Sequence, residues 1–110
     1  MQEILAKAAD LAQAIKKSKV YRSLLAAQDR LEKDGATKKL MQDFDEQSRQ
    51  IREKEKKLTP VEVEDKRKLQ QLRDQMQSNE LVQELLRAQA DYAQMMAKVN
   101  ETIEMALQPR

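Results

Sequence analysis

The chain has 110 residues, enough for one small domain, and its 40% hydrophobic content includes only one Phe and two Tyr. With one Gly, two Pro and 36% charged residues, the composition is typical of long helices and coiled coils and argues against a fold rich in strands. The absence of Cys and His excludes disulfides, thiolate metal sites and the commonest general base. We therefore expect an all-α fold, an elongated helical bundle with a long antiparallel helical hairpin and a C-terminal helix patterned in heptads.

Two amphipathic helices are predicted at the N-terminus, over residues 2–17 and 19–33. The apolar residues of each helix repeat at spacings of four, three and four: Ile4, Ala8, Leu11 and Ile15, then Val20, Leu24, Ala27 and Leu31. Ser18 is a suitable N-cap for the second helix, and one continuous, kinked helix is the alternative. Gly35 is predicted to end the second helix, because only Gly adopts a left-handed backbone without a steric penalty.

A polar hairpin is predicted for the middle of the chain, with helices over residues 36–57 and 60–77. The Thr-Pro-Val-Glu stretch at 59–62 has a capping-box pattern, which predicts that the second helix is capped at its Thr. Folding at this point brings the few apolar residues of the two helices together, Phe44 near Met76 and Ile51 near Leu69. The tip of the hairpin is almost entirely polar, so we expect it to project into solvent.

The longest predicted helix spans residues 79–107 and follows a Ser-Asn pair that is suited to capping. Residues at alternating steps of three and four form a heptad seam: Val82, Leu85, Gln89, Tyr92, Met96, Val99, Ile103 and Ala106. We expect the first two helices to cover one side of this helix with Ile4, Leu11, Ile15, Leu24 and Leu31. By hypothesis, the residues that form an interface are Val82, Leu85, Leu86, Tyr92, Met95, Met96, Val99 and Ile103.

An apolar stripe that a chain cannot bury by itself is usually buried against a partner, most simply a second copy. We therefore expect a homo-oligomer, in the first place a dimer, or an assembly with related chains or another protein. A monomeric bundle that hides the stripe is the alternative. Residues 1–33 carry a net charge of +3 and residues 79–110 a net charge of −2. Ordinary solvated helix faces are the favoured interpretation of this asymmetry, and steering of a partner or pairing of two copies is the alternative.

The sequence contains no pattern that predicts catalytic, cofactor-binding or metal-binding residues, so we do not expect an enzyme. Its carboxylates lie beside Lys and Arg on predicted helices, where ion pairing is their ordinary role. The basic clusters at 16–22 and 49–57 have only Tyr21 as an aromatic neighbour, so nucleic acid is not an expected partner. A nucleic-acid-associated or chaperone-like protein that holds clients through basic helix faces is the alternative function.

The chain has no uninterrupted apolar run of the length that a signal peptide or a membrane span requires. We therefore expect a cytoplasmic protein with no membrane contact.

Two stretches resemble the YlbF/YmcA family of small bacterial helical proteins. They read AADLAQAIKKSKVYRSLLAAQDRLEKDGATKKLMQDF at 8–44 and NELVQELLRAQADYAQMMAKVNETI at 79–103. The shared features are an early LA.AIK.S..Y motif, a helix break before a KKLM..F motif, a polar middle segment, and a last helix that contains Y/F, M and VN..I. The resemblance implies an all-α protein that self-associates or pairs with relatives. It also implies non-enzymatic regulation of competence, sporulation and biofilm development, through complexes that assist an RNA-degrading endonuclease.

Some members of this family carry cysteines tied to an iron–sulfur cluster. This sequence has no Cys, so that cofactor does not carry over, and we expect no cofactor. The family supplies no catalytic residues to transfer.

Overall fold

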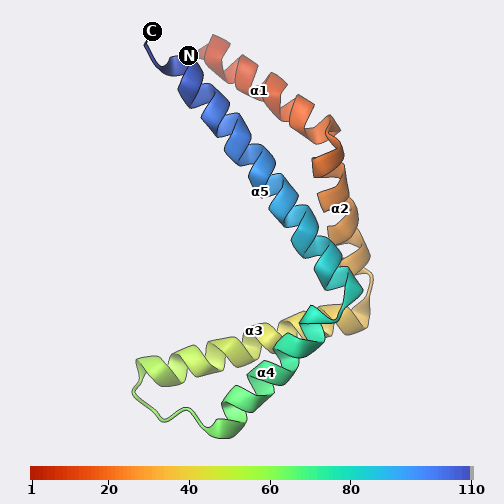
Figure 1. Cartoon of the computed structure of the whole chain (residues 1–110), viewed down its shortest axis with the longest axis vertical. Coiled ribbons are helices and arrows are strands. Elements are labelled where there is room, and N and C mark those ends of the chain that lie inside the picture. Colours follow the sequence, from red (N-terminus) through yellow and green to blue (C-terminus); the bar gives the residue numbers. More distant parts are fainter. Residues whose placement is uncertain (110) are drawn as a thin grey trace. The chain divides into compact units, whose positions relative to one another are not determined.

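The computed structural model describes residues 1–109, and every regular element among them is an α-helix (Figure 1). The helices are α1 (Gln2–Lys17), α2 (Lys19–Glu32), α3 (Gly35–Lys56), α4 (Val63–Gln77) and α5 (Glu80–Leu107). The prediction of an all-α fold is confirmed, and the predicted helix ends agree within one residue except at the start of α4. Internal contacts divide the chain into two compact units, one of residues 1–29 and residues from 85 onwards, the other of residues 30–84. A single domain over 1–110 stays a prediction.

Ser18 separates α1 from α2 in the first unit. Its backbone is extended, with φ −68° and ψ 149°, so the alternative of one kinked helix is wrong. The Ser18 hydroxyl donates to the carbonyl oxygen of Ile15 at 2.6 Å and accepts the N–H of Tyr21 at 3.1 Å. One side chain therefore ends α1 and caps α2, as the sequence predicts.

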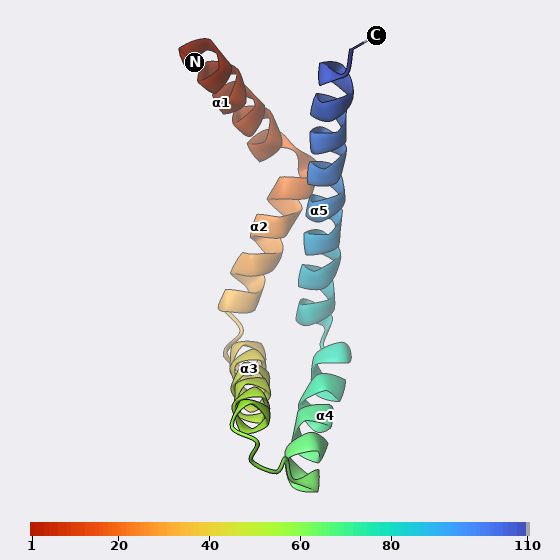
Figure 2. The same ribbon diagram turned by 90° about the vertical axis from the view of Figure 1, so that its left-hand side faces the viewer.

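The core of the first unit lies between α2 and α5, which run side by side in both views (Figures 1 and 2). Leu24 and Ala27 of α2 are buried, and so are Leu85 and Ala88 of α5. Both pairs are three residues apart, so each pair lies on one side of its helix. This core buries one side of α5, which is the role that the sequence assigned to Leu24.

The second unit contains a hairpin in which α3 packs against α4 (Figure 2). Ile51 is buried, while Phe44, Leu69 and Met76 are half-buried. The guanidinium carbon of Arg73 lies 6.0 Å from the centre of the Phe44 ring, in reach of a cation–π interaction. The predicted hairpin is confirmed, and the individual pairs, Phe44 with Met76 and Ile51 with Leu69, stay predictions.

The start of α4 differs from the prediction. Its N-cap is Glu62 and not Thr59, and the carboxylates of Glu62 and Asp65 each accept the backbone N–H of the other residue. The Asp65 carboxylate also accepts the ammonium of Lys54 from α3 at 2.5 Å, and the Asp65 carbonyl accepts the side-chain amide of Gln47 at 3.0 Å. These contacts from α3 hold Asp65 in the first turn of α4, so the helix starts three residues later than predicted.

The end of α3 is closed by a residue in the left-handed conformation, Leu58, with φ 57°. The N–H of Thr59 donates to the carbonyl of Lys54 at 2.8 Å, and the N–H of Leu58 donates to the carbonyl of Glu55 at 3.2 Å. This pair of bonds is the Schellman motif, in which Gly normally takes the left-handed position. The Leu58 side chain is 92% exposed, so no packing contact compensates for its backbone strain.

The connection between α2 and α3 needs no left-handed residue. Gly35 has no positive φ and is the first residue of α3, so the prediction that Gly35 ends the preceding helix in a left-handed conformation is wrong. The Asp34 carboxylate accepts the N–H of Thr37 at 2.9 Å and caps α3 directly. Only Lys33 and Asp34 separate the end of α2 from Gly35, so the connection between the two helices is very short.

A hydrogen bond joins the starts of α3 and α5 in the second unit. Asn79 caps α5, and its side-chain oxygen accepts the N–H of Val82 at 3.0 Å. The other half of the same amide donates to the hydroxyl of Thr37 at 2.9 Å. Thr37 is 3% exposed, so this hydroxyl and its partner are shielded from water.

Replacing Leu58 by Gly should stabilise the protein. A left-handed conformation costs an L-residue about 1–2 kcal/mol, and the greater chain entropy of unfolded Gly offsets part of the gain, which leaves about 0.5–1 kcal/mol. Urea denaturation measures this change. Lys57→Gly is the matched control, because Lys57 has φ −90° and should lose stability. A less stable Leu58→Gly protein would contradict the argument.

Replacing Asn79 by Ala should cost about 2 kcal/mol of unfolding free energy, because α5 loses its cap and the buried Thr37 hydroxyl loses its donor. Ser78→Ala is the control. The Ser78 hydroxyl donates to the Asp74 carbonyl at an exposed site, so its loss should cost less than about 0.5 kcal/mol. Equal losses in the two variants, measured by thermal and urea denaturation, would contradict the bridging role of Asn79.

Candidate protein-interaction surface

The contact between Tyr21 and Tyr92 marks the place where burial stops in the first unit. The two ring centres are 5.9 Å apart and the rings are tilted by 50°, a favourable geometry for an aromatic pair. On the side of this pair towards the start of α5, Leu85 and Ala88 are buried. From Tyr92 to the end of the described chain, no residue of α5 is buried.

Helix α1 has no buried residue at all. Ile4 is 66% exposed and Leu11 is 39% exposed, although both belong to the apolar stripe that the sequence predicted. The prediction that Ile4, Leu11 and Ile15 cover α5 is therefore wrong for Ile4, whereas Leu11 lies beside α5 but stays partly open to solvent, and Ile15 is half-buried. Because the extended backbone at Ser18 interrupts the helix, α1 does not continue the course of α2 along α5, and it leans away from α5 in Figure 2.

The C-terminal half of α5 and α1 together form an apolar depression of about 350 Å³. We call it the α1–α5 depression, and it is lined by Leu11, Met95, Lys98, Val99, Thr102 and Ile103. Lys98 and Thr102 are its only polar lining residues, and the rest present hydrocarbon and thioether groups. A surface of this kind on a helical protein is typical of a protein-binding site.

The structure separates the eight predicted interface residues by their burial. Val82 and Leu85 are buried within the chain, at 2% and 8% exposure. Tyr92, Met95, Met96 and Val99 are half-buried, and Leu86 and Ile103 are exposed at 52% and 46%. The heptad pattern could not make this distinction, because it shows which residues share a side of the helix and not which of them the rest of the chain covers. The sequence predicted that Leu11 packs against α5, but it did not include Leu11 among the interface residues, because the stripe of α1 has the same spacing as that of α2.

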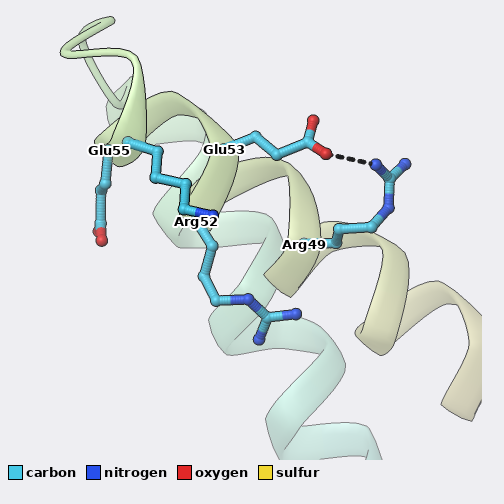
Figure 3. Close-up of a pocket in the computed structure, with 5 residues that line it drawn as sticks. Arg49, Arg52, Glu53 and Glu55 are labelled. Atoms are coloured by element: carbon cyan, nitrogen blue, oxygen red, sulfur yellow. Dashed lines mark hydrogen bonds and ion pairs between the residues drawn. The ribbon is translucent and has the colours of Figure 1, made fainter.

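The tip of the hairpin carries a second depression, of about 580 Å³, where charges of both signs alternate (Figure 3). It is lined by Arg49, Arg52, Glu53, Glu55 and Lys56. Arg49 donates to Glu46 at 2.5 Å and to Glu53 at 2.8 Å, and Figure 3 shows Arg52 pointing away from that pair. The acidic side chains among the basic ones prevent a concentrated positive field, which is what would attract a phosphate backbone.

Three ionisable groups of the hairpin have shifted pKa values. The Arg49 guanidinium, and then the Gln50 amide, hold the pKa of Glu46 below its usual value, and Glu46 in turn raises the pKa of Arg49. The Lys54 ammonium, followed by the backbone N–H of Glu62, lowers the pKa of Asp65. All three shifts come from hydrogen-bonded ion pairs, within α3 for Glu46 and Arg49 and between α3 and α4 for Asp65, which is a structural role.

The profile of one family matches residues 4–108, nearly the whole sequence, and this family is described as control of competence regulator ComK, YlbF/YmcA. The chain belongs to the YlbF/YmcA family. The match confirms the resemblance that the two sequence stretches carry.

The fold of this YlbF/YmcA chain is similar to that of a chain in the X-ray crystal structure of Bacillus subtilis RicA in complex with RicF. The TM-score is 0.85 at 20% sequence identity, and the match covers 96% of this chain and 93% of the other. At this identity the likeness establishes a shared fold. A comparison with curated proteins gave no match.

Among residues 1–109 there is no group of three or more acidic or metal-ligating side chains placed to hold a metal ion. The sequence has no Cys, so its residues do not fit an iron–sulfur cluster of the kind that thiolates hold. Within the same range, none of the helices combines the length and the apolar character needed to cross a bilayer.

Asp65 should make the stability of the hairpin depend on pH. Its pKa is lowered from 3.8 in the folded protein, so its contribution is present above that value and is lost as the pH falls through the lower folded pKa. Asp65→Asn should therefore lower the thermal midpoint at pH 7, and the difference from the wild type should shrink below about pH 4.

The control for this measurement is Glu64→Gln. Glu64 pairs with Arg67 of its own helix and is 76% exposed, so its replacement should change the midpoint little at either pH. A gap between Asp65→Asn and the wild type that is equal at pH 7 and pH 2.5 would contradict the role of the Lys54–Asp65 pair.

Proposed function

We propose that this YlbF/YmcA chain is a non-enzymatic regulatory subunit that acts by assembling with another protein, either a second copy or a related chain of the family. The observation that carries the proposal is the α1–α5 depression, an apolar surface lined by Leu11 of α1, a helix without a buried residue, and by five residues of α5. In water such a surface is stabilised by contact with another apolar surface. The partner's contact would also restrain α1.

The solved relative supports the proposal of a protein partner. RicA shares the fold of this chain and is found in a complex with RicF. The family description supports a role in the control of competence. We extend the proposal, on the strength of the family resemblance, to sporulation and biofilm development in the bacterial cytoplasm, through complexes that assist an RNA-degrading endonuclease.

The charged side chains support a structural role for the rest of the molecule. The carboxylates at the hairpin are held in ion pairs, such as Arg49 with Glu53 and Lys54 with Asp65. The hairpin would then present a polar surface to the regulated protein while the α1–α5 depression supplies the affinity.

The double variant Leu11→Glu/Val99→Glu should abolish the assembly. Each buried apolar side chain contributes about 1.5–3 kcal/mol, so the loss of two should raise Kd at least ~100-fold. Sedimentation equilibrium measures self-association, and co-purification measures binding to a related YlbF/YmcA chain expressed from the same genome.

The matched control is Gln13→Glu/Ala97→Glu, which adds two charges to exposed positions on the opposite sides of the same two helices. It should assemble like the wild type. Circular dichroism of both proteins shows whether the helices are intact. Unchanged assembly of a folded Leu11→Glu/Val99→Glu protein, by both measurements, would overturn the proposed function.

A further inference from the structure

The tip of the hairpin carries an apolar side chain that has no packing contact within the chain. We call residues 57–62, which connect α3 to α4, the tip loop. Leu58 in this loop is 92% exposed, and no other large apolar residue among residues 1–109 is as exposed. Val63, the first residue of α4, is 73% exposed. The tip therefore presents two apolar side chains on a hairpin whose surface is otherwise polar.

The backbone of Leu58 distinguishes it from an ordinary exposed leucine. Its φ of 57° is left-handed, a conformation that costs any residue with a side chain more than it costs Gly. The carbonyls of Glu55 and Lys54 accept the N–H groups of Leu58 and Thr59, so this conformation belongs to the folded end of α3. Backbone strain that no internal contact offsets is concentrated at binding sites and switches. The Leu58 side chain is thus explained by a contact with another molecule.

The depression of about 580 Å³ lies on the α3 side of the same tip. Two of its lining residues, Arg49 and Glu53, neutralise each other at 2.8 Å. The cations of Arg52 and Lys56 also line it, and neither forms an ion pair with a residue in the range 1–109. Figure 3 shows Arg52 pointing away from the Arg49–Glu53 pair. The depression therefore offers two free cations next to the tip loop.

The charges that are left unpaired at the tip are mostly positive. Lys57, beside Leu58, is exposed and forms no ion pair within the described chain. It joins the cations of Arg52 and Lys56, and Glu55 is the unpaired carboxylate among them. The Glu62 carboxylate caps α4, where it accepts a backbone N–H. An apolar anchor beside three free cations is complementary to an apolar pocket that carboxylates surround.

We infer that the tip loop docks on an acidic surface of the regulated protein, with Leu58 in an apolar pocket and Arg52 and Lys56 against the Asp or Glu side chains that border it. This inference rests on the proposed function, since it names the contact through which the hairpin meets the regulated protein. An apolar anchor and an arginine are the residue types that most often carry the binding energy of an interface.

A protein fits this surface better than a lipid bilayer or a nucleic acid. An anionic membrane would repel Glu55 and Glu62, and two apolar side chains bury less than the single acyl chain that gives only marginal anchoring. A single-stranded nucleic acid is held by aromatic side chains as well as cations, and residues 45–63 contain no aromatic residue. The pocket of a folded protein can match both the side chain of Leu58 and the charges beside it.

The contact can be tested by photo-cross-linking in cells of the bacterium of origin. The full chain carries benzoylphenylalanine in place of Val63, which keeps Leu58 intact. Irradiation should give an adduct with one protein, and mass spectrometry should place the cross-link in a peptide with Asp or Glu beside apolar residues. An adduct with a lipid, an RNA, a second copy or a peptide without acidic residues would overturn the inference, and so would the absence of any adduct.

The same experiment with Leu58→Gly separates binding from folding. This variant should be more stable than the wild type, yet its adduct at position 63 should fall at least ~10-fold, because the apolar anchor is lost. Leu58→Met keeps an apolar side chain and should cross-link like the wild type. As a control site, benzoylphenylalanine at the exposed Gln70 should give no adduct that depends on Leu58. An equal adduct at position 63 with and without Leu58 would overturn the inference.

Charge reversal tests the acidic border of the pocket. Isothermal titration with the purified cross-linked protein should show that Arg52→Glu/Lys56→Glu raises Kd at least ~10-fold, and more at low salt. Lys68→Glu/Arg87→Glu makes the same change in net charge at two exposed positions outside the tip, and it should leave Kd unchanged. Circular dichroism checks that both variants are folded. Equal Kd values for the two variants would contradict docking on carboxylates.

The outcomes also separate this inference from the proposed function. A chain that assembles through Leu11 and Val99 but gives no adduct dependent on Leu58 would overturn the tip contact and leave the assembly standing. A chain that gives the adduct dependent on Leu58, but binds neither a second copy nor a related chain, would support the tip contact and count against the proposed assembly.

Discussion

Helix α5 is 28 residues long and has apolar side chains on more of its circumference than the rest of the chain can cover. Leu24 and Ala27 of α2 bury one side of its N-terminal half. From Tyr92 onwards, no described residue of α5 is buried. Burial of apolar area is the main favourable term in folding, at roughly 25 cal/mol per Å². The C-terminal half of α5 and the whole of α1 therefore draw little stability from their own chain, and contact with another protein would stabilise them by mass action.

The helices and most of their caps could be predicted, because they depend on residues close together in the sequence. Ser18 and Asn79 each have a side chain that caps the helix immediately after them, and both predictions are confirmed. The start of α4 could not be predicted from the same rules. Two capping boxes compete there, and the one at Asp65 is favoured by Lys54, which reaches it only once the hairpin has folded.

The candidate surface could be predicted only in part. The heptad pattern showed that α5 has apolar residues on a wide part of its circumference, but it could not tell which of its sides the chain itself would cover. Which side is covered depends on where α2 lies. Leu85 and Leu86 illustrate this, because they are neighbours in the sequence but Leu85 is 8% exposed and Leu86 is 52% exposed.

The left-handed Leu58 has a consequence for the dynamics of the hairpin. Its strain lowers the free energy needed to open the tip locally, while Ile51 and the buried amide of Gln47 keep the nearby helices closed. The amide protons of Leu58 and Thr59 should then exchange with solvent by partial fraying of the last turn of α3, well before global unfolding. The same exposed segment is the part of the hairpin that a protease would reach first.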